Sequence, residues 1–523
     1  MFYIHSNRLA LRGGWISMML LTERYADKIL GVLSCFDRVV IQGTLPNFCY
    51  AQGMAFFLSY NHIRIFDYPR FAEPLRDELR DNAERIAREN DLEIEFIRKK
   101  NFRKENRIRD ILEERGNHPG LVHIFSAMEP CQTYKPWHDK QTHKTFLKPD
   151  NGKCLHYYFY FIDEELGLCY VRVPTWCPFR LQIYFNGHNW LAVHLAKNGI
   201  PFTLMDNVFS RISDFNRAQS LSDSFKVDLL HGRLDHFAER FCPIIKQFSL
   251  RYHWSIMQAE YATDIVFKRQ EDLQLIYGHL TRTAIHTVKP DNIATFLGRK
   301  LHDNYEGEMG NNFNTRIEGT RIKHNMGPVS IKMYDKFGLI LRIETTVNDV
   351  SFFKHYRLVE HRDGSESKKL AQMRKGIYSL SALRQLLFAA NRRYIEFISA
   401  IDDPSAGIKK LDKISKTIVK SERSYKGFNL FDDEDQLLFE AIASGEFTIS
   451  GFQNKHLRDK LSGKSSPQIS RTIKRLHVHG LIRKIGHTYK YYLSKFGSQV
   501  ITMGLKLKEL LIIPSLAGHL SLA

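Results

Sequence analysis

The sequence predicts an α/β and α+β multidomain protein with an N-terminal layer of alternating strands and helices, a central antiparallel sheet with helices, and a C-terminal helical module. Strand-like and helix-like segments alternate between residues 37 and 128. Strand patterns separated by turn residues fill residues 315–346, and a capped helix followed by a hairpin pattern fills residues 466–493. With 523 residues, 43% of them hydrophobic, the chain can form about two to four packed domains.

The chain is strongly basic, with 76 Lys and Arg residues against 57 Asp and Glu residues and a formal net charge of +19. A polyanion is the natural partner of such a charge, because released counterions supply affinity that does not depend on sequence. The composition therefore favours DNA as the partner and leaves RNA as an alternative. Apolar runs near 18 residues and lipidation signals are absent from the sequence, which argues against a membrane partner.

Cysteine usage points to a reducing compartment. The seven cysteines are odd in number and contain no CxxC pair, which argues against a disulfide framework and a zinc finger. We therefore expect reduced thiols in a cytoplasmic protein.

Residues 1–20 are expected to be a poorly specified extension, and residues 21–150 an α/β domain. Within that domain the pattern predicts strands at 39–41, 63–66, 92–97 and 121–125, and helices at 51–60, 72–89 and 103–115. Strands alternating with helices of this length are typical of a parallel layer. The sequence has no GxGxxG or Walker loop in this region, so it predicts no nucleotide site.

Residues 151–403 are expected to form a mixed α+β domain. An aromatic hairpin, with strands at 155–162 and 168–173, begins it. A mainly helical stretch follows over 180–301, with helices expected at 189–197, 233–241 and 254–278. The consecutive aromatic residues 157–161 could stack on nucleobases, but alternate strand residues more commonly pack in a core.

The segment TRIEGTRIKHNMGPVSIKMYDKFGLILRIETT, residues 315–346, reads as three antiparallel strands at 315–324, 329–335 and 339–346. A three-residue loop, 336–338, keeps one face apolar by pairing Met333 with Leu341 and Ile331 with Ile343. That register sets Lys332 opposite Arg342, a like-charge pair that destabilises a sheet unless an anion lies beside it. Either Glu344 supplies that charge in an ion-pair network, or a nucleic-acid phosphate does so.

The residues KMYDKFGLILRIET resemble the Tyr-Asp-Lys and Leu-Arg-Ile-Glu strand pair of phage and plasmid replication initiator proteins. The resemblance implies that Tyr334 forms a transient link to a DNA phosphate, with Glu344 and Asp335 as base or metal ligands. It also implies Mg²⁺ or Mn²⁺ as a cofactor of a nuclease, although the sequence offers no His pair on a strand as the metal ligands of that family. Asp37, at the head of the first strand, could be a further ligand or a salt-bridged strand end.

Residues 404–432 are expected to be a basic linker, and residues 433–523 the C-terminal domain. Its third helix has Ser466 as a cap, Pro467 in its first turn and Gly480 at its end. Ile469, Ile473 and Leu476 form one face of this helix, and its basic residues lie elsewhere.

The run LHVHGLIRKIGHTYKYYLSKFG resembles the winged helix-turn-helix domains of the MarR-like kind, in which a recognition helix precedes a hairpin. The resemblance implies that the helix enters the major groove and that the hairpin touches the backbone. The expected DNA-binding residues are Gln468, Arg471, Thr472, Lys474, Arg475, Arg483, Lys484 and Lys490, with Lys332 and Arg342 in the central sheet.

These observations predict a DNA-binding protein of a mobile element, plasmid or phage that acts in DNA processing or replication initiation, with DNA nicking or strand transfer as its enzymatic activity. A non-enzymatic, MarR-like transcriptional regulator and an RNA-binding protein are the alternatives. A homodimer is compatible with the winged-helix resemblance, and residues 505–511 could form a partner helix.

Overall fold

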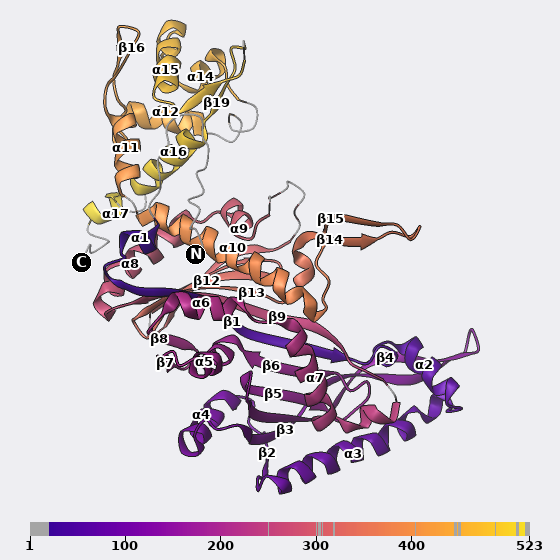
Figure 1. Ribbon diagram of the computed structural model, residues 1–523. Coiled ribbons are helices and arrows are strands. Elements are labelled where there is room, and N and C mark those ends of the chain that lie inside the picture. The colour runs from indigo at the N-terminus through magenta and orange to yellow at the C-terminus, as the bar shows by residue number, and fades with distance from the viewer. Residues whose placement is uncertain are drawn as a thin grey trace. The chain divides into compact units, whose positions relative to one another are not determined.

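The computed structural model describes residues 20–248, 250–299, 301, 305, 307–316, 319–402, 404–443, 447, 451–486, 488–508 and 512–517. The chain divides into two compact units, unit 1 over residues 1–402 and unit 2 over residues 403–523. The expected extension over 1–20 lies outside the described residues except for residue 20. The two units are described separately (Figure 1).

Unit 1 is built on an 11-stranded sheet with the strand order β10-β11-β12-β13-β9-β1-β6-β5-β4-β3-β2. All neighbouring strands in it are antiparallel except β2 and β3, which are parallel. The strands span β1 (Ile29–Thr44), β2 (Ile94–Phe96), β3 (Gly120–Asp139), β4 (Lys144–Asp163), β5 (Gly167–Pro174), β6 (Leu181–Asn186), β9 (His253–Phe267), β10 (Met309–Arg316), β11 (Gly319–Met326), β12 (Val329–Lys336) and β13 (Ile340–Val347).

The expectation of a parallel N-terminal layer is wrong for most of the sheet. The first strand, β1, pairs antiparallel with β6 and β9, which lie far along the chain. The expected strand at 63–66 does not form, and a short 3-10 helix, η1 (Ile65–Asp67), begins there instead. The expected boundary at residue 150 falls inside β4, so both expected domains contribute strands to the same sheet.

The helices of unit 1 include most of those expected in the N-terminal part. The expected helix over 254–278 is wrong in its first half, because residues 253–267 form β9 in the middle of the sheet. The described helices are α1 (Leu21–Arg24), α2 (Ala51–Tyr60), α3 (Tyr68–Glu89), α4 (Lys104–Arg115), α5 (Gly187–Lys197), α6 (Phe215–Asp223), α7 (Val227–Phe241), η2 (Pro243–Phe248), α8 (Gln270–Thr287), α9 (Pro290–Phe296), η3 (Val350–Phe352), η4 (Ile377–Ser379) and α10 (Leu380–Asp402). Two separate hairpins complete the unit, β7 (Phe202–Met205) with β8 (Val208–Ile212) and β14 (Lys354–Glu360) with β15 (Glu366–Gln372).

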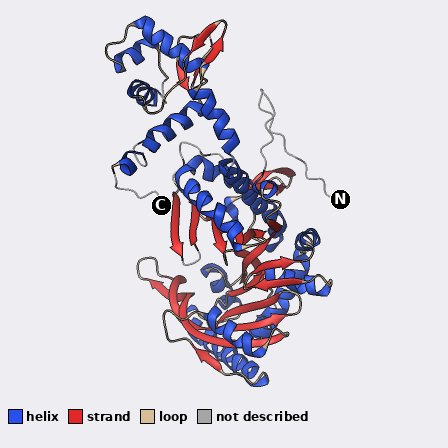
Figure 2. Ribbon diagram, turned by 90° about the vertical axis from the view of Figure 1, so that its left-hand side faces the viewer, coloured by secondary structure: helices blue, strands red, loops and turns tan. Residues whose placement is uncertain are grey.

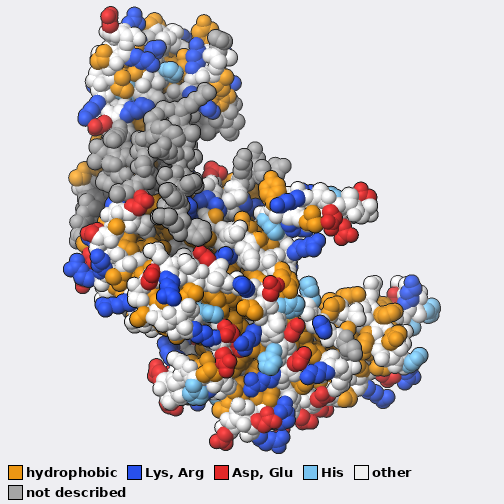
Figure 3. All heavy atoms as spheres, in the orientation of Figure 1, with side chains coloured by type: hydrophobic (Ala, Val, Ile, Leu, Met, Phe, Trp, Pro, Cys, Tyr) orange, Lys and Arg blue, Asp and Glu red, His pale blue; other side chains and the backbone are white. Residues whose placement is uncertain are grey.

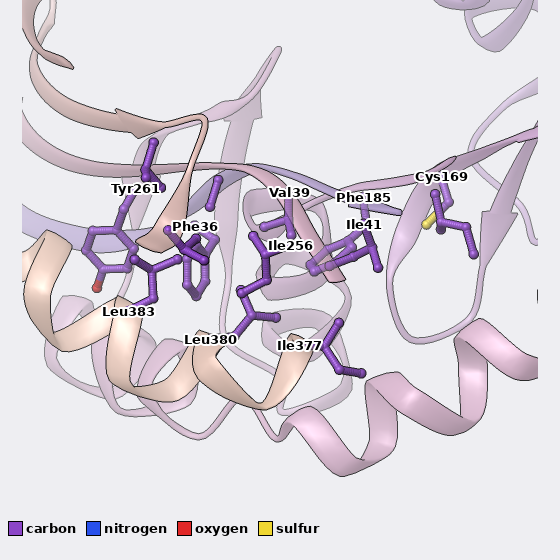
Figure 4. Close-up of a cluster of buried hydrophobic side chains, with 14 of the residues drawn as sticks. Phe36, Val39, Ile41, Cys169, Phe185, Ile256, Tyr261, Ile377, Leu380 and Leu383 are labelled. Atoms are coloured by element: carbon purple, nitrogen blue, oxygen red, sulfur yellow. The ribbon is translucent and has the colours of Figure 1, made fainter. Parts of the chain in front are cut away.

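The main core of unit 1 lies between one face of the sheet and the helices. Alternate residues of β1 and β9 point into it, so that Phe36 meets the ring of Tyr261 edge to face at a centroid distance of 5.2 Å. Leu380 and Leu383 of α10 pack against the same cluster (Figure 4). The non-directional burial of these apolar side chains holds the helices on this face.

The aromatic hairpin of β4 and β5 is confirmed, and its aromatic residues divide between two cores. Tyr157, Phe159 and Phe161 belong to the main core. Tyr158 and Tyr160 face the other side and pack in a smaller cluster with α4. This division follows because alternate residues of a strand point to opposite faces. The consecutive aromatic residues 157–161 are therefore explained by core packing on both faces of the sheet.

The β12–β13 hairpin has a different register from the expected one. Its loop consists of residues 337–339, one residue later than expected, so Met333 pairs with Ile343 and Ile331 with Thr345. Phe337 and Gly338 both adopt positive φ angles, 58° and 68°, in this loop. A shift of the loop by one residue moves each pair by two positions, which keeps the same residues on each face. The expected single strand over 315–324 is also wrong, because β10 ends at Arg316 and β11 starts at Gly319.

Unit 2 is mainly helical, with two short hairpins (Figure 2). Its small core includes Ile469, Ile473 and Leu476, as expected for the apolar face of the third helix. The region expected as a linker, 404–432, contains a helix and a hairpin. The elements are α11 (Pro404–Ser415), β16 (Ile418–Lys420), β17 (Arg423–Tyr425), α12 (Asp433–Ala443), α14 (Asn454–Lys460), α15 (Ser466–Val478), β18 (Ile482–Lys484), β19 (Tyr491–Leu493), α16 (Lys495–Leu507) and α17 (Ile513–Leu516).

The ends of α15 are set by local chemistry. The cap is Ser465 rather than Ser466, and its backbone N–H and hydroxyl both donate to Oε1 of Gln468. Gly480, with a φ of 74°, follows the last turn and allows the chain to leave the helix. The expected partner helix at 505–511 is described only to residue 508, and α16 ends at Leu507.

All seven cysteines are free thiols. Within the described part of the chain, no helix combines the length and apolar character needed to cross a bilayer.

Candidate functional site

A group of charged side chains lies on the face of the sheet opposite the main core. On β12, Ile331 and Met333 point into the core, so the intervening Lys332 and Tyr334 point to the other face. The Lys332 ammonium lies 2.5 Å from Oε1 of Glu344 on β13 and 3.3 Å from Oε1 of Glu260 on β9. The Tyr334 hydroxyl donates to Oε2 of Glu344 at 2.6 Å.

The observed register replaces the expected like-charge pair with an ion pair. Lys332 lies directly opposite Glu344, and Arg342 lies opposite Tyr334. The expectation that Lys332 and Arg342 face each other is therefore wrong. Of the two explanations that the sequence left open, the structure contains the ion-pair network between Lys332 and Glu344.

Arg342 is fully buried and cannot be the DNA contact that the sequence suggested. Its guanidinium binds Asp264 of β9 through two bonds of 2.6 and 2.7 Å and reaches Asp37 of β1 at 3.1 Å. Burial alone would raise the pKa of Asp37, but Arg342 and His188 outweigh burial and hold that pKa well below its usual range. Arg342 thus offsets part of the charge of two buried carboxylates that would otherwise be costly.

His188, near the start of α5, completes this buried network. Its two ring nitrogens each lie 3.2 Å from a carboxylate oxygen, one of Asp37 and one of Asp264. Burial would lower the pKa of His188, but the neighbouring Cys35, Asp264 and Asp37 raise it well above its ordinary value. Asn186 caps α5 and also donates to Asp37, so the start of this helix is fixed against β1.

Three carboxylates of this region could hold a divalent cation. Asp37, Glu260 and Glu344 each offer an oxygen, and these oxygens lie within 4.8 Å of one another. Carboxylate oxygens are the ligands that Mg²⁺ and Mn²⁺ prefer. Because Lys332 lies between Glu260 and Glu344, a bound cation would have to displace its ammonium group.

Of the three residues expected to act in catalysis, the structure brings two into contact. Tyr334 and Glu344 are hydrogen bonded, whereas Asp335 is adjacent to Tyr334 on the strand and points to the opposite face. Burial and the Glu344 carboxylate raise the pKa of Tyr334 well above its ordinary value. The phenol is therefore protonated at neutral pH, and Glu344 is the group placed to accept its proton.

Sequence reasoning missed Glu260 and Asp264 and left Asp37 as an isolated acid. All three reach the site because β1, β9 and β13 are neighbours in the sheet. The pairing of β1 with β9 joins segments more than 200 residues apart. A local pattern contains no signal for such a pairing.

In unit 2, α15 carries an exposed polar face opposite its buried aliphatic stripe. Arg471 and Lys474 are exposed, and neither forms an ion pair with any residue that the structure describes. Thr472 is half-buried and its hydroxyl donates to the carbonyl of Gln468, while the Gln468 side chain serves the helix cap. Figure 3 shows Lys and Arg side chains spread over the visible face of this unit.

Arg475 has a structural role that the sequence did not reveal. Its guanidinium makes bonds of 2.9 and 3.1 Å to the Asp435 carboxylate and donates to the backbone carbonyls of Lys426 and Gly427. It also lies 3.8 Å from the centre of the Phe428 ring. The expectation that Arg475 contacts DNA is therefore corrected, because its donors are already used within the unit.

The β18–β19 hairpin presents further cations. Arg483 and Lys484 are exposed, and Lys490 is half-buried. The Lys484 ammonium lies 5.5 Å from the Tyr489 ring, and that of Lys490 lies 5.9 Å from the Tyr492 ring. These are weak contacts at an exposed site, which leave the ammonium groups available to an anion.

Comparison with known proteins identifies no relative of the chain. No protein-family model, no curated protein and no solved structure matches the chain.

Proposed function

We propose that the chain binds duplex DNA through unit 2, in the manner of a winged helix-turn-helix domain. In this proposal α15 enters the major groove and the β18–β19 hairpin contacts the backbone. The observation that carries it is the division of α15 into a buried stripe and a face on which Arg471 and Lys474 are exposed, without an ion pair to a described residue. Free cations on one helix face are what a phosphate backbone requires.

The test is the salt dependence of duplex binding by the full chain. Each phosphate neutralised contributes about −0.9 to the slope of log K against log salt concentration. We expect Arg471→Ala with Lys474→Ala to weaken binding and to reduce the slope by about 2. A double variant with an unchanged affinity and slope would contradict a contact through this helix.

A second proposed function, DNA processing for a mobile element, plasmid or phage, rests on the hydrogen bond between Tyr334 and Glu344. Glu344 would take the phenol proton while the Tyr334 oxygen forms a bond to a backbone phosphorus. The P–O bond to the leaving DNA oxygen would break, and the Lys332 ammonium, which is hydrogen bonded to Glu344, would protonate that oxygen. Asp37, Glu260 and Glu344 are the residues that would hold Mg²⁺ or Mn²⁺, and a cation bound there would replace the Lys332 ammonium and stabilise the charge of the leaving oxygen in its stead.

Incubation of the full chain with single-stranded and duplex DNA plus Mg²⁺ or Mn²⁺ tests this second function. A covalent adduct that Tyr334→Phe abolishes, with its fold intact, is the expected result. Neither nick nor adduct would leave a non-enzymatic, MarR-like regulator as the better description. RNA that co-purifies specifically with the chain would favour the RNA-binding alternative.

A further inference from the structure

A second hairpin in unit 2, β16–β17, lies in the region expected to be a linker. Ile418 pairs with Tyr425 and Lys420 with Arg423, and the two turn residues Ser421 and Glu422 have φ angles of 49° and 58°. Two positive φ angles at the turn are the pattern of a tight two-residue hairpin. The element is therefore a defined hairpin rather than an extended connection.

This hairpin forms one wall of a surface groove whose other wall is α15. Figure 1 shows β16 beside α15 in unit 2. Residues from both elements line the same depression: Arg423, Ser424, Tyr425, Lys426, Ser470, Arg471, Thr472, Lys474 and Arg475. The groove thus adjoins the helix face that is proposed to meet DNA.

The hairpin is held against α15 by packing just after its second strand. Arg475 binds the carbonyls of Lys426 and Gly427, and a Cβ atom on Gly427 would lie 1.9 Å from the carbonyl oxygen of Ser415. Phe428 N–H donates to the Ile414 carbonyl at 2.8 Å. These contacts fix the segment that follows the hairpin against the end of α11 and the side of α15.

The charge of the groove is positive on both walls. Lys420, Arg423 and Lys426 are exposed on the hairpin side, and none of them forms an ion pair with a described residue. Lys420 directly opposes Arg423 across the strands, a like-charge pair that destabilises a hairpin when no anion lies near it. Glu422, in the turn, is the one acid of the hairpin itself.

The cations of three elements also act on one histidine. Burial, and then Lys474 of α15, Lys420 of β16 and Lys484 of β18, lower the pKa of His477. Lys420 and Lys484 therefore lie close enough to the end of α15 to influence it, one from each hairpin.

We propose that the β16–β17 hairpin is a second phosphate-binding element, and that the groove between it and α15 takes the sugar-phosphate backbone of the duplex. The proposal rests on the proposed DNA binding by α15. It adds a binding element to α15 and the β18–β19 hairpin. The hydroxyl groups of Ser424 and Ser470 supply neutral donors, and the cations supply charge without base recognition.

The experiment compares three double variants of the full chain in duplex binding across a salt series. Lys420→Ala with Arg423→Ala tests the hairpin, and Arg471→Ala with Lys474→Ala tests the helix. Lys99→Ala with Lys100→Ala removes two exposed cations of unit 1 and serves as the matched control for charge. The melting temperature of each variant is also measured, to show that a loss of binding is not a loss of folding. Both hairpin residues are exposed, so their replacement should leave the melting temperature unchanged.

We expect the hairpin variant to reduce the salt slope by about 2, equally for unrelated DNA sequences, and the control to leave it unchanged. If the helix variant weakens binding and the hairpin variant does not, the proposed role of the hairpin is overturned, and the proposed DNA binding by α15 still stands. An equal loss in the control would also overturn it, because the effect would then be one of net charge. If the helix variant kept full binding while the hairpin variant lost it, the proposed role of α15 would fail instead.

Discussion

Arg471 and Arg475 lie one turn apart on α15 and have different surroundings. Arg471 is exposed, whereas Arg475 is bound to Asp435 and to two backbone carbonyls. Residues four apart share a helix face, so both arginines were expected to have the same role. The acid that distinguishes them lies 40 residues away, on α12.

Replacement of Arg475 by Ala should therefore destabilise unit 2, while Arg471→Ala should not. Loss of Arg475 leaves the buried Asp435 carboxylate without its ion pair and two backbone carbonyls without their side-chain donor, at a cost of about 2 kcal/mol. Calorimetry of the full chain would show a lower transition for Arg475→Ala and a shift within about 0.5 kcal/mol for Arg471→Ala. Equal effects of the two substitutions would contradict the structural role of Arg475.

His324 should make the stability of unit 1 depend on pH. It is fully buried on β11 between Asn311 and the Tyr394 hydroxyl, and burial lowers its pKa from 6.5 to about 4. Because the folded-state pKa is the lower one, its contribution is fully present above pH 6.5 and is lost as the pH falls to about 4. The loss amounts to about 3 kcal/mol.

The variant His324→Gln removes this titration and keeps a polar side chain. Its free energy of unfolding should vary less between pH 6.5 and pH 4 than that of the unaltered chain. A pH dependence of the same size in both proteins would show that His324 does not carry it.

The residues of the charged site could be predicted in part. Lys332, Tyr334 and Glu344 stand two or more positions apart in one hairpin, and their shared face follows from strand alternation. Their pairing depended on the loop, which is one residue later than the apolar pattern suggested. Sequence alone could not show that Arg342 is buried, because the carboxylates of Asp37 and Asp264 come from other strands.

At the scale of elements, the start of α5 is fitted closely to β1. A Cβ atom on Gly187 would lie 2.1 Å from the backbone carbonyl oxygen of Phe36, which cannot move without breaking the sheet. We expect Gly187→Ala to cost about 2 kcal/mol or more.

A helical glycine with open space provides the control for this substitution. Gly232 in α7 has no atom within 4 Å of the position of a Cβ, so Gly232→Ala should stabilise unit 1 by about 0.5–1 kcal/mol. Denaturant titration gives both values. A neutral Gly187→Ala would show that α5 can shift relative to the strand that carries Asp37.

Elements with strong local signals were predicted well. Helices α2, α4 and α15 begin and end within a residue or so of their expected bounds, since periodicity and caps are local. β9 was mistaken for a helix, because its second half, residues 261–267, is buried on both faces and shows no alternation. The β16–β17 hairpin was missed because its strands have three residues each.

At the scale of the whole molecule, the sheet of unit 1 could not be derived from the order of the segments. Helices between the first strands suggested parallel crossovers, but β1 takes its two partners from much later in the chain. The result is one mainly antiparallel sheet that collects Asp37, Glu260 and Glu344 on a single face. Non-local pairing of this kind is decided by the fit of whole faces, not by local propensity.

The measurement that tests the account most directly is the affinity of the full chain for duplex DNA as a function of salt concentration, with Arg471→Ala and Lys474→Ala beside it. The account predicts that binding weakens steeply as salt rises and that the double variant has a slope smaller by about 2. Binding that is insensitive to salt, or a double variant that binds duplex as tightly and with the same slope, would contradict it.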